Sequence, residues 1–212
     1  MATIALVAPE PSIMRLAIRS SLVALATCAL LAPSLWGCIG IAVGAGAAVA
    51  TTATEERGLA GAASDAKILV EINHHWFQRD HMMFGKLEAT VYDGRVLVTG
   101  VVEDDAVRTE AIRLTWLAPG IKEVYNEIEV VGPTNLIDYS RDVWIGTQLR
   151  TGLTLDAKVY SNNYSISVVN GAVYIIGIAR SREELDAVVN RARNLSYVKR
   201  VVSHVRVKDG TA

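Results

Sequence analysis

The residues with the clearest potential for chemistry form a histidine-rich segment, Asn73-His-His-Trp-Phe-Gln-Arg-Asp-His81. On a helix, Glu71, His74 and His81 share approximately one face, and imidazole and carboxylate groups are zinc ligands. However, the helix is expected to end near Asp80 and no fourth ligand is evident, so a polar helix face explains these residues as well. No Ser, Cys or Lys nucleophile has a base at a recognisable spacing. We therefore predict no metal site, no cofactor and no enzymatic activity.

Cys38 is the second residue with potential chemistry, because it ends an apolar segment that follows two arginines. Residues 22–31 form the apolar region, and Leu35-Trp-Gly-Cys38 places a small residue before the cysteine. This pattern resembles a bacterial lipoprotein signal peptide, in which the cysteine thiol is acylated and becomes the first residue of the mature chain. We predict a signal peptide over residues 1–37, with Met14 as the candidate start of translation, and a lipid attached to Cys38.

The residues after Cys38 are expected to tether the chain to a membrane. Residues 38–63 are rich in glycine and alanine, which cannot build a packed core. Ile39 follows the cysteine, where similar lipoproteins retained in the inner membrane usually carry aspartate, so the outer membrane is indicated. The alternative is an uncleaved helix, but the apolar segment is broken by Pro33 and falls short of the ~20 residues that span a bilayer.

The rest of the chain is an internal duplication. Residues 92–130 align without a gap with residues 169–207 at a constant offset of 77. Gly94 then falls on Gly171 and Gly100 falls on Gly177, and the apolar pattern repeats throughout. We predict two small domains, at residues 64–131 and 138–208, joined by a linker at Gly132-Pro-Thr-Asn135.

Each copy has the same sequence of structural signals. Apolar residues at helical spacing come first, followed by two β-rich runs joined by Asp93-Gly94 in one copy and Asn170-Gly171 in the other. Both dipeptides suit the positive φ angles of a type I′ hairpin turn. A second helix begins at Asp104 in the first copy and with a capping box, Ser181 and Glu184, in the second. A last strand completes an α+β domain, in which two helices cover one face of a three-stranded sheet.

These residues resemble the dual BON-domain lipoproteins of the bacterial outer membrane. The motifs that carry the resemblance are Tyr92–Gly100, Glu123–Ile128, Asp142–Arg150, Asn170–Gly177 and Val198–Val201. The resemblance implies a lipid-anchored protein on the periplasmic face of the outer membrane, which binds anionic phospholipid through its second BON domain and supports envelope integrity. It implies that lipid contact centres on an aromatic residue of the first helix of that domain, here Trp144. Four residues later the family often has a basic residue, whereas this chain has Gln148.

Charge is divided unequally between the two copies. Residues 64–131 hold 7 Lys and Arg against 12 Asp and Glu, a net charge of −5, whereas residues 138–212 hold 11 against 7, a net charge of +4. The basic residues of the second copy include Arg141, Arg150, Arg180, Arg182, Arg191, Arg193, Lys199, Arg200, Arg206 and Lys208. This imbalance makes the second copy the candidate for contact with an anionic surface, although a solvated surface without a partner has the same composition.

Trp144 is expected on the helix face opposite the apolar stripe that faces the core. At ~100° per residue it sits about 140° from the centre of the apolar stripe, beside Arg141, Gln148 and Thr151. With Arg150, these residues form the predicted phospholipid-binding surface. Trp144 could instead pack against the first domain or remain an unused exposed residue.

Two classes of function therefore follow from the sequence. The first is a lipid-anchored module that binds anionic phospholipid membranes. The alternative is a non-enzymatic envelope adaptor that binds outer-membrane proteins or peptidoglycan. Nucleic acid is not expected as a partner, because a signal peptide directs the chain out of the cytoplasm.

Overall fold

The computed structural model describes residues 55–131 and 139–208, which belong to one compact unit, residues 46–212. The predicted signal peptide, Cys38 and the linker at residues 132–135 lie outside the described residues. We call residues 55–131 the first copy and residues 139–208 the second copy.

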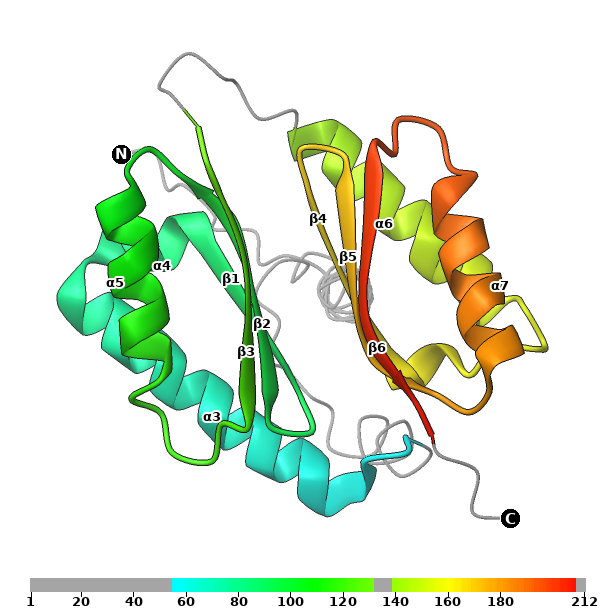
Figure 1. Ribbon diagram of the computed structural model, residues 1–212, viewed down its shortest axis with the longest axis horizontal. Helices are drawn as coiled ribbons and strands as arrows, with labels where there is room; N and C mark the ends of the chain where they lie inside the picture. The colour runs from blue at the N-terminus through cyan, green and yellow to red at the C-terminus, as the bar shows by residue number, and fades with distance from the viewer. Residues whose placement is uncertain (1–54, 132–138, 209–212) are drawn as a thin grey trace, which may run out of the picture. The chain divides into compact units, whose positions relative to one another are not determined.

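The two copies have the same core order of elements (Figure 1). The elements of the first copy are α3 (Gly58–Arg79), α4 (His81–Lys86), β1 (Leu87–Tyr92), β2 (Arg95–Val102), α5 (Asp105–Thr115) and β3 (Glu123–Val130). Those of the second copy are α6 (Tyr139–Thr154), the 3-10 turn η2 (Ser161–Asn163), β4 (Tyr164–Val169), β5 (Ala172–Ala179), α7 (Arg182–Arg193) and β6 (Arg200–Val207). The first copy adds the short helix α4, where the second has η2.

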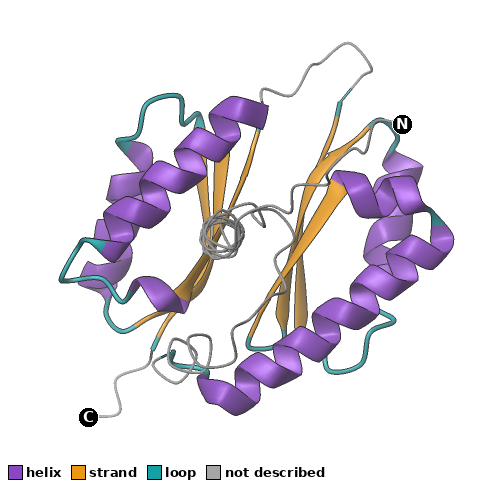
Figure 2. Cartoon of the chain, turned by 180° about the vertical axis from the view of Figure 1, so that it is seen from behind, coloured by secondary structure: helices purple, strands orange, loops and turns teal. Residues whose placement is uncertain are grey.

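Each copy is a three-stranded sheet with helices on one face (Figure 2). The strand orders are β1-β2-β3 and β4-β5-β6, with the first pair antiparallel and the second pair parallel in both sheets. The parallel pair requires a crossover connection, and α5 and α7 provide it. The helices bury their apolar stripes against the sheets, so each copy has its own core. The predicted α+β fold is confirmed.

The hairpin turns have the predicted conformation. The φ angles are +52° at Asp93 and +71° at Gly94, and +52° at Asn170 and +78° at Gly171. Positive values at both central residues define a type I′ turn, which aspartate, asparagine and glycine tolerate better than other residues.

A buried carboxylate holds each turn, a feature that the sequence analysis missed. Asp65 of α3 accepts hydrogen bonds from the backbone N–H groups of Asp93 and Gly94, at 2.7 and 2.8 Å. Asp142 of α6 accepts the corresponding pair from Asn170 and Gly171, at 2.6 and 2.8 Å. Each aspartate therefore fixes the first helix of its copy onto the hairpin.

The helix ends agree with the sequence in part. The side chains of Asp104 and Ser181 accept backbone N–H bonds and cap α5 and α7, as expected. Glu184 does not close a simple capping box, because its carboxylate accepts from the backbone N–H groups of Arg180 and Tyr160. The last residues of the predicted tether, 58–63, are helical, because α3 begins at Gly58.

A third apolar cluster joins the two copies. It consists of Tyr92, Leu97, Ala172, Tyr174 and Ile176, all buried. Burial raises the pKa of Tyr92 and of Tyr174 to about 12, because removal from water disfavours the charged phenolate. The faces of the two sheets that the helices leave uncovered therefore supply this cluster.

Arg95 adds a polar contact between the copies. Its side chain is fully buried, and its guanidinium donates to the carbonyl oxygens of His204 and Gly177 at 2.9 and 2.8 Å. Thr99 and Ser167 are also joined across the copies by a hydroxyl–hydroxyl bond of 2.9 Å. Buried polar groups that are paired in this way favour one arrangement of the copies.

Candidate functional site

The helix α6 presents Trp144 as the sequence predicted. Ile145, Leu149 and Leu153 form its buried stripe, whereas the Trp144 side chain is 41% exposed. Gln148 and Thr151, about one and two turns farther along, are exposed on the same face of the helix. The aromatic ring thus faces away from the core of the second copy.

Tyr197, in the loop between α7 and β6, meets Trp144 at the surface. The two rings meet edge to face with their centroids 5.7 Å apart, and the Arg141 guanidinium carbon lies 4.9 Å from the centroid of the Tyr197 ring. Ser140, Arg141, Trp144 and Tyr197 line one surface pocket. We call these four residues the aromatic cluster. Its rings belong to the second copy alone, and Trp144 is no member of the apolar cluster that joins the copies.

Arg150 does not belong with the aromatic cluster. Its guanidinium donates to the carbonyl oxygen of Ile166 in β4 and would contact a side chain added at Gly146. On the helix it is six residues from Trp144, about 120° around the axis. Of the four residues predicted to surround Trp144, the structure brings Arg141, Gln148 and Thr151 to its face and directs Arg150 toward the sheet.

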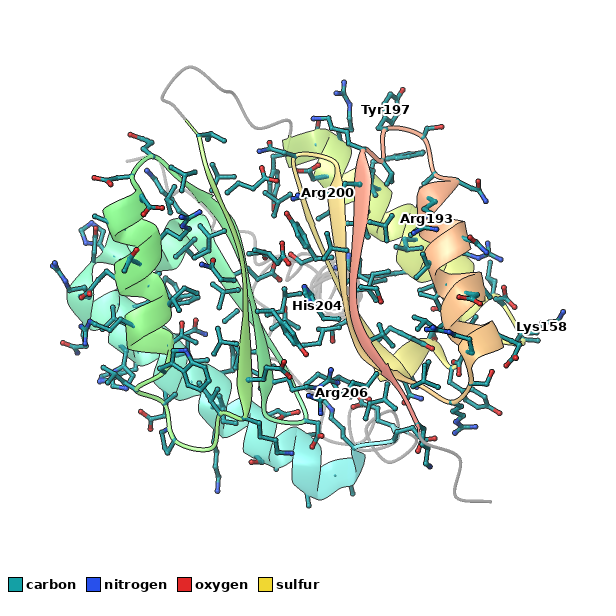
Figure 3. The ribbon with its side chains drawn as sticks, viewed as in Figure 1. Lys158, Arg193, Tyr197, Arg200, His204 and Arg206 are labelled. Atoms are coloured by element: carbon teal, nitrogen blue, oxygen red, sulfur yellow. The ribbon has the colours of Figure 1, made fainter. Side chains whose placement is uncertain are left out.

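Much of the positive charge of the second copy is paired with acidic residues. Arg200 and Arg206 of β6 bind Glu129 and Glu123 of β3, at 3.2 and 2.6 Å (Figure 3). Arg180 and Lys208 both bind Glu56, at 2.7 and 2.6 Å. A further pair, between Arg191 and Asp156, lies within the second copy. The opposite net charges of the two copies therefore form ion pairs that stabilise the contact between the copies. The sequence did not predict this contact.

Arg141 belongs to the aromatic cluster, and two further basic residues, Arg193 and Lys199, flank Tyr197 in the sequence. Arg141 contacts the Tyr197 ring, Arg193 ends α7, and Lys199 follows Tyr197 by two residues. Arg193 and Tyr197 are labelled at the same end of α7 in Figure 3. Within the described residues, Arg193 and Lys199 have no carboxylate at ion-pair distance. The cluster therefore combines two exposed rings with local positive charge.

The residues of the histidine-rich segment are divided between two helices. α3 ends at Arg79 and His81 begins α4, so His81 is not on the helix that carries Glu71 and His74. Over residues 55–131 and 139–208, no three His, Cys, Asp or Glu side chains are placed to hold a metal ion. The helices described in those ranges also include none with the length and apolar character to span a membrane.

Comparison with protein families gives a match in each copy. Residues 64–132 and residues 141–209 each match the model of the BON domain, and the two matched ranges are again 77 residues apart. The chain belongs to the BON-domain family. The expected resemblance to dual BON-domain proteins is therefore confirmed, and the first and second copies are its first and second BON domains.

Several bacterial proteins are similar to this BON-domain chain. An uncharacterized protein in the gshII 5' region of Anaplasma centrale is 39% identical over 145 residues, covering 68% of this chain and 95% of that protein. Outer membrane lipoprotein DolP of Haemophilus influenzae is 28% identical over 177 residues, covering 82% of this chain and 91% of that protein. A 21 kDa hemolysin of Actinobacillus pleuropneumoniae is 28% identical over 145 residues, covering 68% of this chain and 74% of that protein.

Proposed function

We propose that this protein is an outer-membrane lipoprotein that faces the periplasm and binds anionic phospholipid through its second BON domain. The observation that carries the proposal is the aromatic cluster, where Trp144 is exposed opposite the core and Arg141 adds positive charge. The similarity to an outer membrane lipoprotein, DolP, supports the location. The cysteine motif at Cys38 supports lipid attachment, with palmitate as the expected acyl group.

The expected free energies of membrane binding favour reversible attachment. Burying much of an indole ring contributes about 1–3 kcal/mol. Each basic side chain close to an anionic surface contributes about 1 kcal/mol at modest salt. Neither contribution holds a protein on a bilayer alone, but an acyl chain on Cys38 would keep the domain at high local concentration beside the membrane. Membrane attachment through the second BON domain is therefore expected to be reversible. The role that we propose for it is non-enzymatic support of envelope integrity.

A second candidate is an envelope adaptor that binds outer-membrane proteins or peptidoglycan. The first BON domain supports it, because Phe77 and Phe84 are exposed with their rings edge to face, 6.0 Å apart, and Trp116 and Leu117 are exposed as well. Large exposed apolar side chains of this kind are typical of protein contacts. The net charge of the first domain is negative, which disfavours an anionic bilayer as its partner.

Vesicle binding separates the two candidates. The fragment should be residues 46–212, because Glu56 and Arg57 contact the folded domains and a fragment starting at residue 64 would lack both. Trp144→Ala should weaken cosedimentation with phosphatidylglycerol vesicles about tenfold, since the indole contribution is lost.

The matched control is Trp116→Ala. Trp116 is 50% exposed, like Trp144, but lies in the first BON domain, so its loss should leave binding unchanged. Raised salt should weaken binding of all variants by screening the basic residues. Equal binding by wild type and Trp144→Ala, or no preference over phosphatidylcholine vesicles, would favour the adaptor.

A further inference from the structure

Tyr197 occupies a backbone position that is glycine in the other copy. At the offset of 77, Tyr197 aligns with Gly120, and both lie in the loop before the last strand. The φ angle is +93° at Gly120 and +69° at Tyr197. Left-handed conformations of this kind suit glycine and are unfavourable for a bulky side chain, because Cβ approaches the backbone. The second copy therefore keeps a tyrosine at a position where glycine would be more stable.

The backbone of the fold, and not the side chain, sets this conformation. In the first copy, a Cβ placed on Gly94 would lie 3.1 Å from the Gly120 carbonyl oxygen, and in the second a Cβ on Gly171 would lie 2.8 Å from the Tyr197 carbonyl oxygen. The loop thus packs against the hairpin turn in the same way in both copies. Since glycine satisfies this contact in the first copy, the Tyr197 ring is not required for it.

The Tyr197 ring also contributes little to the core. Its side chain is 60% exposed, and it is not a member of any of the three buried clusters. Its ring contacts are with Trp144 and Arg141, which align with Lys67 and Ser64 of the first copy. The same fold therefore forms in the first copy without any aromatic residue at these positions.

We propose that Tyr197 is a second membrane anchor, which enters the interfacial region of an anionic bilayer beside Trp144. Tyrosine suits this region, because its ring is apolar and its hydroxyl remains in contact with water or headgroups. The Tyr197 ring lies edge to face with the exposed Trp144 ring, and the Arg141 guanidinium lies over the Tyr197 ring. This inference rests on the proposed membrane-binding function and adds an anchor from the loop between α7 and β6.

The test is Tyr197→Gly in the fragment 46–212, which restores the residue of the first copy. The melting temperature should stay the same or rise, because the backbone strain is relieved. Binding to phosphatidylglycerol vesicles should weaken roughly fivefold to tenfold, because part of an aromatic ring is no longer transferred from water into the bilayer interface. Tyr197→Asn should also weaken vesicle binding without lowering the melting temperature, since asparagine tolerates a positive φ angle. Tyr197→Phe should retain most of the binding.

Tyr160→Ala is the matched control. Tyr160 is also exposed and in the second copy, but it follows α6 and contacts Arg180 near the start of α7, away from the Trp144 end. Its removal should leave vesicle binding unchanged. A lower melting temperature for both Tyr197→Gly and Tyr197→Asn would show a structural role and overturn the inference.

Two further results separate this inference from the proposed function. If Trp144→Ala weakens binding while Tyr197→Gly binds like wild type, the second anchor is refuted and the membrane function stands. If neither variant changes binding, both are refuted.

Discussion

Replacing Asp142 tests how the second BON domain positions its first helix. The Asp142 side chain is 6% exposed in α6 and accepts hydrogen bonds from the N–H groups of Asn170 and Gly171, at 2.6 and 2.8 Å. Trp144 follows two residues later, so the same contact fixes the part of α6 that carries the aromatic cluster. We expect Asp142→Ala to destabilise the second domain and Asp142→Asn to destabilise it less.

The expected loss of stability follows from the two hydrogen bonds that Asp142 accepts. A hydrogen bond to a charged group contributes about 1.5–3 kcal/mol, and both are lost in Asp142→Ala. Water can replace part of this at the turn, where Asn170 is only half-buried, so a loss of about 3 kcal/mol is expected. Asp142→Asn keeps one acceptor oxygen and should lose about half as much.

Urea denaturation of the fragment 46–212 measures these changes in the free energy of unfolding. Asp65→Ala is the companion variant, because Asp65 makes the equivalent two bonds in the first domain. Its loss should be at least as large, since Asp65 also pairs with Arg57 at 2.7 Å. Losses below about 0.5 kcal/mol for both alanine variants, a size typical of ordinary surface substitutions, would refute the assignment of these carboxylates as structural anchors.

Three further predictions concern the turns, the contact between the domains and the anchor. Gly171→Val should lower the melting temperature more than Gly94→Val, because an added Cβ meets a carbonyl oxygen at 2.8 Å in the first case and 3.1 Å in the second; equal melting of both variants and wild type would contradict this. Hydrogen bonding by Lys208 lowers the pKa of Glu56 below its usual 4.5, so the stability that Glu56 contributes is present above that pH and is lost as pH falls through the lowered pKa. Glu56→Gln should therefore reduce the fall in melting temperature on acidification. If the melting temperature of this variant depends on pH as in wild type, the contact of Glu56 with Arg180 and Lys208 is contradicted. In the full chain, Cys38→Ser should abolish palmitate labelling, and continued labelling would contradict the lipoprotein assignment.

Local chemistry explains which parts of the fold could be predicted. Asp93-Gly94 and Asn170-Gly171 require a specific turn, and Asp104 and Ser181 satisfy the N–H groups of helices that start directly after them. The parallel pairing of the last strand was not predicted, because it depends on contacts made after the crossover helix has formed. The buried aspartates were missed because each acts on a turn 28 or 29 residues away.

The candidate site was predicted less completely than the fold. Helical periodicity placed Trp144 correctly, since its orientation depends on α6 alone. The charge division predicts a surface for an external partner, whereas Glu56, Glu123 and Glu129 of the same chain pair with Arg180, Arg206, Arg200 and Lys208. Tyr197 was missed, although its alignment with Gly120 in the duplicated sequence was a signal that could have identified it.

Site-specific labelling tests membrane insertion by the second BON domain most directly. The only cysteines of the chain are Cys28 and Cys38, so the fragment 46–212 has none and a single introduced cysteine can carry a polarity-sensitive fluorophore. Val143→Cys places the label beside Trp144, and Val70→Cys places it on α3 of the first domain, with the original side chains 49% and 65% exposed. With phosphatidylglycerol vesicles, the label at position 143 should shift to the blue and be quenched by nitroxide lipids, while the label at position 70 should not change. An unchanged label at position 143, or insertion of the label at position 70 instead, would contradict the proposed membrane-binding surface.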